Sequence, residues 1–407
     1  MDQSFSEKSF WKTLRKGDAQ KYNLGKNRGE IKDSLKTIED AVSGEGFKFQ
    51  TFSTQIRNKF KVFTTNNKVD EFVLRKVADN LKRALGIKSA DRNELVPQVI
   101  NLAKEARDCT IYKFDIGSFF ESIDRGVLLK NLNVEEKLSL KTVQLISSLF
   151  QSEQIKMITG LPRGLSISPI LAEYYLRNLE SACRRFDYCY YYTRYVDDML
   201  FFCHGNSNSL NADLVKNLPA GLTLNSKKAA VVSIDRKGLL LDERSSEKSI
   251  SYLGYEIIFP SIDLEKMKIS IPQSKIAKIK SRIAMSVVRF IEDKSYEKLL
   301  LRIRFLTCNF QIGGSKQIGI LYSGVYYNHR YIDSESAQLI FSDLDDYLQK
   351  LIYSKTGSLG RKLHPLLSNS RRKELCSHSF LMGHKKPIYR KLKNKELGEA
   401  TEAWAHA

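Results

Sequence analysis

Three aspartates stand where strand-like runs end. Asp115 follows the run 109–114, which has β character, and the adjacent Asp197 and Asp198 separate two runs rich in aromatic and apolar residues. Strand-forming residues on both sides of the acidic pair predict a hairpin with two carboxylates at or near its tip. An isolated Asp-Asp pair is more often a surface turn, since Asp is a common turn residue. Burying these carboxylates is costly unless cations neutralise them, so a further carboxylate at a neighbouring strand end favours a metal site.

Carboxylates in this arrangement suit phosphoryl transfer. On adjacent strands of one antiparallel sheet, Asp115 and Asp197 would clamp two divalent cations roughly 3.5–4 Å apart, which aligns both oxygens of an in-line displacement. Mg²⁺ is the expected cofactor, with Mn²⁺ as a substitute, because hard carboxylate oxygens are the ligands present. The six cysteines and six histidines show no ligand spacing, so we expect reduced thiols, without a zinc site or a disulfide framework.

The composition indicates a folded protein with a polyanionic partner. Of the 407 residues 42% are hydrophobic, enough for a real core, and 66 Lys and Arg against 46 Asp and Glu give a net charge of +20. Such an asymmetry commonly marks a nucleic-acid partner. A membrane surface is the rival, but no apolar run is long enough to span a bilayer and the first residues show no signal-peptide pattern. We therefore expect a cytoplasmic protein with no membrane partner.

Two predicted helices precede the strand that ends at Asp115. Apolar residues recur every four positions over 70–85 and predict a helix with one buried face. The sequence Asp91-Arg92-Asn93-Glu94 has the form of a capping box and predicts the start of a second helix. The strand that ends at Asp115 follows, and Gly117 and Ser118 break it.

A glycine-rich loop lies between the two acidic segments. The run 154–158 predicts a strand that leads into the loop 160–169, whose two glycines would let its backbone approach a ligand closely. Ser168 and Pro169 predict the start of a helix that runs to about Phe186, and its free N–H groups suit a phosphate. Further strands are predicted over 229–234 and 251–257, and the segment from 273 onward is mainly helical and basic.

The order of these motifs resembles that of the reverse transcriptases over at least residues 110–257. The segment 195–198, Tyr-Val-Asp-Asp, is similar to the family's Tyr-x-Asp-Asp box. Four other segments resemble elements of the family. Residues 115–120 look like its first catalytic strand, and 160–169 look like its Pro-x-Gly loop with a Ser-Pro helix start. Residues 222–228 look like its lysine-bearing element, and 252–254 look like its primer grip.

The resemblance implies a role for each matched residue. Catalytic roles fall to Asp115, Asp197, Asp198 and Lys228, the lysine as proton donor to departing pyrophosphate. Metal ligation falls to Asp115, Ile116, Asp197 and Asp198. Substrate contacts fall to Arg92, Ile116, Phe119, Phe120, Arg163, Gly164 and Tyr195, with Phe120 as a steric gate against a nucleotide 2′-OH. The primer grip would be Tyr252, Leu253 and Gly254.

The resemblance also implies an α+β fold, the right-hand polymerase, with helical fingers, an antiparallel-sheet palm, and a basic helical thumb with a C-terminal extension. The expected domains are 1–90 for the N-terminal helical region and fingers, 91–259 for the fingers and palm core, and 260–407 for the thumb and extension. The implied partners are an RNA template, a DNA product and deoxynucleoside triphosphates. A homo-oligomer or a second defence protein is a further partner to consider.

Departures from the family pattern narrow the subgroup. Arg163 stands where group II intron and retroviral enzymes usually have Gln, so a phosphate contact is open at this position. The Asn-Ala-x-x-His and Val-Thr-Gly elements of retron enzymes are missing, and no endonuclease or RNase H signature follows. The chain most resembles bacterial defence-associated and abortive-infection reverse transcriptases, which implies a dedicated noncoding RNA as template.

Several alternatives stay open at this point. The same site would serve untemplated, self-templated or protein-primed DNA synthesis, and an intron maturase would share the motifs. A noncatalytic RNA-binding scaffold would keep the fold and the basic surface, but the intact Asp115, Asp197 and Asp198 speak against it. Arg92 is about equally well explained as a solvated residue at a helix start.

Overall fold

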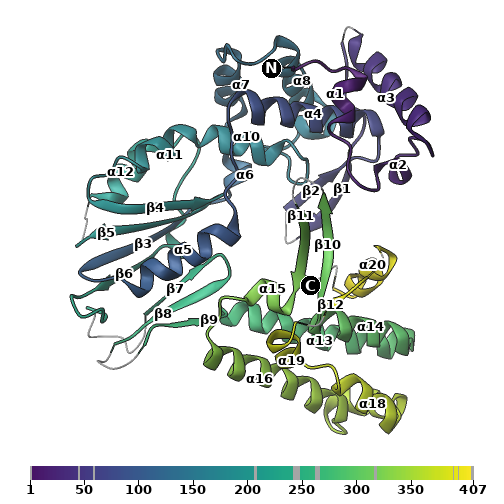
Figure 1. Ribbon diagram of the computed structural model, residues 1–407, viewed down its shortest axis with the longest axis vertical. Coiled ribbons are helices and arrows are strands. Elements are labelled where there is room, and N and C mark those ends of the chain that lie inside the picture. The colour runs from purple at the N-terminus through teal and green to yellow at the C-terminus, as the bar shows by residue number, and fades with distance from the viewer. Residues whose placement is uncertain are drawn as a thin grey trace. The chain divides into compact units, whose positions relative to one another are not determined.

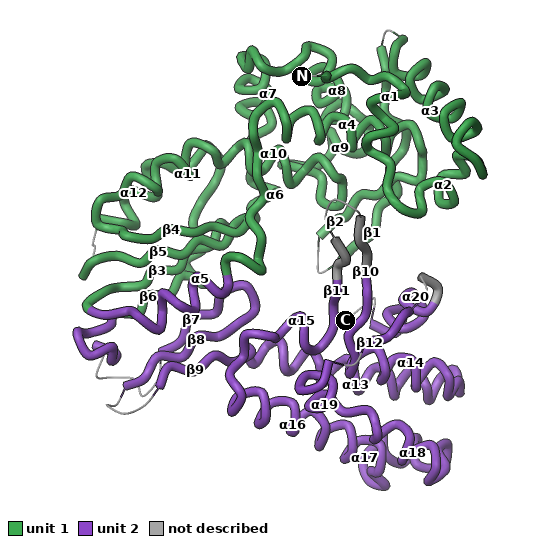
Figure 2. The backbone as a smooth tube through the Cα atoms, in the orientation of Figure 1, with its two compact units in different colours: residues 1–95, 108–233 green, residues 96–107, 234–407 purple. Residues whose placement is uncertain are grey.

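The structure is a computed structural model that describes residues 2–44, 46–57, 60–205, 209–241, 248–261, 266–315, 319–387, 389–392 and 394–404. Its backbone divides into two compact units (Figure 2). Unit 1 consists of residues 1–95 and 108–233, and unit 2 consists of 96–107 and 234–407. These units do not test the predicted division at 90 and 259, which stays a prediction.

Unit 1 contains a helical part and a sheet (Figure 1). The helical part holds one hairpin, β1–β2, and these elements: α1 (Glu7–Trp11), α2 (Asp18–Lys21), α3 (Arg28–Ser43), β1 (Ser53–Arg57), β2 (Phe60–Thr64), α4 (Lys68–Ala84), α6 (Phe119–Ser122), α7 (Arg125–Asn133), α8 (Leu140–Gln151), α9 (Glu153–Lys156) and α10 (Ser168–Tyr175). The predicted helix over 70–85 is confirmed as α4, which buries Val73, Val77 and Leu81 as the spacing requires.

The sheet of unit 1 has the order β4-β5-β3-β6. Its strands and the nearby helices are β3 (Cys109–Asp115), α11 (Arg177–Cys183), β4 (Cys189–Tyr195), β5 (Asp198–His204), α12 (Leu210–Asn217), the 3₁₀ turn η1 (Ser226–Lys228) and β6 (Ala230–Ile234). The central strand β5 runs antiparallel to both β3 and β4. Its residues Met199–Cys203 are fully or almost fully buried, so both faces of this strand are covered.

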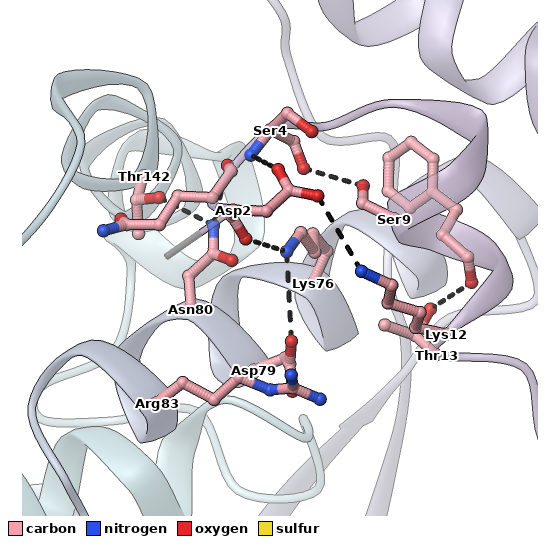
Figure 3. A network of polar contacts seen from close by, with 12 residues as sticks. Asp2, Ser4, Ser9, Lys12, Thr13, Lys76, Asp79, Asn80, Arg83 and Thr142 are labelled. Carbon is pink, nitrogen blue, oxygen red and sulfur yellow. Dashed lines mark hydrogen bonds and ion pairs between the residues drawn. The ribbon is translucent and has the colours of Figure 1, made fainter.

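The N-terminal segment of unit 1 is bonded to α4 through buried polar groups (Figure 3). Lys76 Nζ donates to the carbonyl of Asp2 at 3.1 Å, and Asn80 Nδ2 donates to the carbonyl of Gln3 at 3.1 Å. Burial lowers the pKa of Lys76. Because buried polar groups must be satisfied, these bonds fix the start of the chain on the helical part of unit 1.

Unit 2 has its own hydrophobic core, formed mainly by α13, α14 and α16. Its elements are α5 (Arg92–Lys104), whose first residues belong to unit 1, β7 (Lys248–Tyr252), β8 (Tyr255–Phe259), β9 (Lys268–Ser270), α13 (Gln273–Asp293), α14 (Tyr296–Thr307), β10 (Asn309–Ser315), β11 (Gly319–Gly324), α15 (Val325–His329), α16 (Ser334–Tyr353), α17 (Gly357–Leu363), η2 (His364–Leu366), α18 (Asn369–Cys376), α19 (Phe380–Lys385), β12 (Tyr389–Arg390) and α20 (Asn394–Glu402). They include two three-stranded sheets, β7-β8-β9 and β11-β10-β12.

Local predictions from the sequence differ from the structure in three places. Residues 153–156 form the helical turn α9 instead of a strand, and the predicted helix from Ser168 is divided into α10 and α11. The strand predicted over 251–257 is a hairpin, β7–β8, that turns at Leu253 and Gly254. Both turn residues have positive φ, 45° and 90°, as in a type I′ hairpin turn. Across the described residues, the structure has no helix that combines the length and the apolar character of a membrane span.

Candidate active site

Strand pairing brings the three aspartates to one end of the sheet. In the β3–β5 register, Asp115 lies directly opposite Asp198. Tyr195 is also paired with Asp198, so Val196 and Asp197 form the turn between β4 and β5. The carbonyl of Asp197 accepts a hydrogen bond from Ile116 N at 3.2 Å, which ties this turn to the end of β3. The two acidic motifs predicted to be neighbours are therefore neighbours.

The lysine of segment 222–228 also reaches this end of the sheet. Lys228 Nζ donates to Asp115 Oδ1 at 3.0 Å, and Asn225 Nδ2 donates to Asp115 Oδ2 at 3.2 Å. Main-chain bonds hold this segment in place, because Asn225 N donates to the Asp115 carbonyl at 2.7 Å and Gly117 N donates to the Thr223 carbonyl at 2.9 Å. Both carboxylate oxygens of Asp115 are thus engaged by side chains that follow it by more than a hundred residues.

Asp198 has a different partner, Lys113 of β3. Asp198 Oδ1 lies 3.3 Å from Lys113 Nζ, is buried, and receives no hydrogen bond of good geometry. Burial raises the pKa of Asp198 to about 6, although the charge of Lys113 opposes the shift. Burial also raises the pKa of Asp197, with a smaller contribution from the charge of Asp115.

Lys228 carries a positive charge at neutral pH. Burial lowers the pKa of its ammonium, but the hydrogen bond with Asp115 and the charges of all three aspartates outweigh burial and raise it. The side chain is 59% exposed, so the ammonium faces solvent as well as Asp115.

An arginine network supports the turn between β4 and β5. Val196 has φ of 58°, a region that β-branched residues rarely adopt. The Val196 carbonyl accepts from Arg194 Nη1 at 2.9 Å, while the same guanidinium pairs with Glu173 at 2.7 Å and Glu180 at 3.0 Å. Arg194 is only 7% exposed, so the strained turn is held by a buried ion pair network.

The loop 160–164 lies between the β1–β2 hairpin and the residues after Asp115. Leu161 N donates to the Phe120 carbonyl at 2.7 Å, and the Arg163 carbonyl accepts from Phe63 N of β2 at 2.7 Å. A Cβ on Gly164 would lie 2.5 Å from the Phe63 carbonyl oxygen, so the predicted close approach at this glycine is to the protein's own backbone.

The other predicted site residues lie on several elements. Phe119 is buried and packs its ring against half-buried Phe120, with centroids 5.4 Å apart. Arg92 is the first residue of α5. Tyr252, Leu253 and Gly254 lie at the tip of β7–β8 in unit 2. The roles assigned to these residues, and those of Ile116, Tyr195 and the aspartates, stay predictions.

The donor set fits hard divalent cations. Three aspartates lie at one sheet end, and one buried carboxylate oxygen, Asp198 Oδ1, is left without a well-formed hydrogen bond. No group of three or more His, Cys, Asp or Glu with metal-holding geometry occurs among the described residues. In their present positions the carboxylates of Asp115 and Asp198 contact lysines instead.

Several residues at the site were not identified from the sequence. They are Phe60, Lys113, Glu121, Arg194 and Asn225, each of which contacts a predicted site residue or supports its turn. Lys113 could have been identified from the sequence, because it precedes Asp115 by two positions on one strand and therefore lies on the same face of the sheet. Phe60 could not, since its partner Arg163 comes from a distant segment, and the glutamates that hold Arg194 lie on helices that the sequence does not place beside the turn.

One expectation about the cysteines is wrong. Cys189 and Cys203 lie opposite one another on β4 and β5 and form a disulfide, whereas the sequence spacing suggested only reduced thiols. Strand pairing brings together residues that the spacing of cysteines alone does not connect. Cys109, Cys183, Cys308 and Cys376 are reduced thiols, as expected.

Comparison with known proteins places the site in a family. Residues 31–257, more than half of the chain, match the family described as reverse transcriptase (RNA-dependent DNA polymerase). No curated protein matches the chain. A solved telomerase from Candida albicans, in complex with a TWJ fragment of telomeric RNA, is similar at 12% identity and a TM-score of 0.35, over 81% of this chain and 53% of that chain. Apo telomerase from Candida tropicalis is similar at 13% identity and a TM-score of 0.32, over 77% and 56%.

The chain spans about half the length of these telomerase chains. The family match covers all three aspartates, the loop 160–164, Lys228 and the tip of β7–β8. The predicted α+β right-hand polymerase fold and the predicted enzyme class, a nucleotidyltransferase, agree with it. This chain therefore belongs to the reverse transcriptase family of RNA-directed DNA polymerases.

Proposed function

We propose that this chain copies an RNA template into DNA at the sheet end formed by Asp115, Asp197 and Asp198. The reaction is attack of a 3′-OH on the α-phosphate of a deoxynucleoside triphosphate. The observation that carries the proposal is the direct pairing of Asp115 with Asp198, with Asp197 in the adjoining turn and Lys228 on Asp115. A sheet end with three carboxylates and an exposed lysine suits a reaction in which charge moves between phosphate oxygens.

Each residue has a distinct part in this proposal. Asp115, Asp197, Asp198 and Ile116 would hold two Mg²⁺, which lower the pKa of the attacking hydroxyl and neutralise developing charge. Lys228 holds its proton at neutral pH and is exposed enough to donate it to departing pyrophosphate. Phe120, five positions after Asp115, would exclude a nucleotide 2′-OH, and Tyr195, Arg163, Gly164 and Arg92 would line the path of nucleotide and template.

Primer extension tests this proposal. The protein is expected to extend a DNA primer on an RNA template with Mg²⁺, and Asp197→Ala is expected to lower the rate at least about 100-fold, since even outer-shell changes at metal sites cost 10–100-fold. Asp187→Ala, an exposed aspartate in the same unit, is the matched control and should keep the rate. Equal incorporation by Asp197→Ala and the unaltered protein would refute the metal assignment.

The finer proposal is a bacterial defence enzyme with a dedicated noncoding RNA. It is supported by the Gly-Leu-Pro-Arg-Gly-Leu loop and the other motif resemblances in the sequence, and by the net charge of +20. A cytoplasmic location, a homo-oligomer and a second defence protein belong to the same proposal. Purification from the host followed by sequencing of the bound RNA and of the DNA made tests it. Products that stay the same after RNA removal would instead support untemplated synthesis.

A further inference from the structure

Arg163 lies between two aromatic rings that come from different parts of unit 1. Its guanidinium carbon is 4.0 Å from the ring centroid of Phe60, on the β1–β2 hairpin, and 5.0 Å from that of Phe120. Cations over aromatic faces within about 6 Å are attracted by the ring quadrupole. The planar guanidinium can contact both rings at once, which the point charge of a lysine cannot do.

A carboxylate fixes the plane of this guanidinium. Arg163 Nε donates to Glu121 Oε1 at 2.5 Å, and Nη2 donates to Glu121 Oε2 at 2.9 Å. This fork-to-fork pairing sets the orientation of the group as well as its position. Glu121 directly follows Phe120, so the arginine is bonded to the same helical turn, α6, whose ring it contacts.

The backbone of the loop makes the same connection as the side chain. On one side the loop bonds to the Phe120 carbonyl, and on the other it bonds to Phe63 of the hairpin. Neither contact tolerates a side chain at the adjoining glycine: a Cβ on Gly160 would lie 2.0 Å from the Phe120 carbonyl oxygen, and one on Gly164 would lie 2.5 Å from that of Phe63. Both glycines also have positive φ. Hairpin, loop and α6 are therefore one packed assembly.

We infer that Arg163 is a positioning residue that couples the β1–β2 hairpin to Phe120 and thereby sets how strictly the site rejects ribonucleotides. The inference rests on the proposed polymerase function and on Phe120 as the residue that meets the sugar. Phe120 is half-buried, and its ring also packs against Phe119. Loss of the planar cation would free the Phe120 ring to turn, and a ring that turns excludes a 2′-OH less well.

The geometry favours this role over a direct contact with a triphosphate. Two of the three guanidinium nitrogens of Arg163 are bonded to Glu121, which neutralises the charge that a phosphate would seek. A phosphate ligand would also gain nothing from Phe60, which lies on the hairpin and is 38% exposed. A positioning role for Arg163 therefore predicts an effect of substituting Phe60, whereas direct contact of Arg163 with a triphosphate predicts none.

The test is the ratio of kcat/KM for dGTP to that for GTP, measured by single-nucleotide primer extension with Mg²⁺. Arg163→Lys, which keeps the charge, and Phe60→Leu, which keeps apolar bulk, should each lower the ratio by about tenfold, mainly through faster GTP incorporation. Ile56→Ala on the same hairpin, at a side chain that is 79% exposed, is the control and should leave the ratio unchanged. Melting temperatures close to that of the unaltered protein establish that each variant is folded.

A double variant separates positioning from direct contact. Phe120→Ala alone should lower the ratio more than either single variant, and adding Arg163→Lys to it should lower the ratio no further, because the ring through which Arg163 acts is gone. Additive losses, equal losses of dGTP and GTP incorporation in Arg163→Lys, or an unchanged ratio in Phe60→Leu would each overturn the inference. Absence of any incorporation by the unaltered protein would instead overturn the polymerase proposal, and with it this role.

Discussion

Two hairpins of this chain, β4–β5 in unit 1 and β7–β8 in unit 2, turn in two residues, yet they meet the demands of the turn differently. The β7–β8 turn has positive φ at Leu253 and at Gly254, and glycine adopts such a conformation at no steric cost. The β4–β5 turn has positive φ at Val196 alone, where glycine is the usual residue. A β-branched residue at this position costs of order 1–3 kcal/mol.

The difference lies in what surrounds each turn. The Val196 carbonyl is bonded to Arg194, and Arg194 is in turn held by two glutamates from α10 and α11. The acidic turn therefore keeps its shape because neighbouring helices impose it, whereas in the β7–β8 turn one of the two positions with positive φ is a glycine, and Leu253 alone carries a side chain there. Strain concentrated beside the proposed catalytic carboxylates is typical of functional sites. Changes to the support and to the strain should accordingly have different effects.

Removal of Arg194, which supports the β4–β5 turn, should give the largest effect on the free energy of unfolding. Arg194→Met leaves Glu173 and Glu180 without their buried partner, so the free energy of unfolding should fall by about 3–5 kcal/mol in chemical denaturation. Arg184→Met removes an exposed pair with the same Glu180 and should cost less than about 1 kcal/mol. Equal losses in the two variants would mean that the network does not support the turn.

A β-branched residue placed in the β7–β8 turn should have the next largest effect on the free energy of unfolding. Gly254→Val places a β-branched residue at φ of 90°, and we expect a loss of about 1–3 kcal/mol in the free energy of unfolding. Ser251→Val, at an exposed position of the same strand β7, is the control and should be close to neutral, since valine suits a strand. A neutral Gly254→Val would show that this turn tolerates strain as the acidic turn does.

The pH dependence of Mg²⁺ binding isolates the carboxylates, which only the β4–β5 turn carries. With a pKa of about 6, Asp198 is mostly neutral at pH 5 and mostly charged at pH 7. Mg²⁺ affinity should therefore fall about tenfold per pH unit below pH 6. The rise in melting temperature on adding Mg²⁺ should be larger at pH 7 than at pH 5, and Asp198→Asn should remove most of this difference. The same rise at both pH values would contradict the assignment.

Without Mg²⁺, the contribution of Asp198 to stability depends on pH in the opposite direction. Because the pKa of Asp198 is raised in the folded protein, its contribution to stability is fully present below the usual value of 3.8 and is lost as the pH rises through about 6. In EDTA the group therefore favours the folded state more at pH 4 than at pH 7. Asp198→Asn should flatten this part of the stability profile.

Relief of the backbone strain at Val196 should have the smallest effect on the free energy of unfolding. Val196→Gly removes the β-branched side chain but adds backbone freedom to the unfolded chain, so the free energy of unfolding should change by less than about 1 kcal/mol. Primer extension should nevertheless slow, because the turn that carries Asp197 is less firmly fixed. A large loss of stability in Val196→Gly would show that the valine side chain, and not its backbone, holds the turn.

The parts of the site that are close in sequence could be predicted from it. Tyrosines, valine and leucine on both sides of Asp197 and Asp198 mark two strands and a tight turn, and the run before Asp115 marks a third. The order of these segments was enough for the resemblance to a family that the match over 31–257 then established. The same order of motifs predicts a catalytic role for Lys228, and the structure adds its contact with Asp115.

The parts that depend on distant contacts could not be predicted. The β1–β2 hairpin shows no alternation, because all five residues of β1 are exposed, so no period of two is visible there. The run 154–158 is too short for its apolar residues to distinguish a strand from the helical turn that forms. The pairs of Arg194 with Glu173 and of Arg163 with Glu121 join segments whose proximity only the folded chain defines.

The direct opposition of Asp115 and Asp198 makes strand register a condition for activity. Side chains alternate between the faces of a sheet, so a slip of β3 by one residue would turn Asp115 to the other face, away from Asp198. Such a molecule would be compact, helical and inert. The specific activity of a preparation would then report the fraction of molecules with correctly aligned strands, which circular dichroism and gel filtration would not detect.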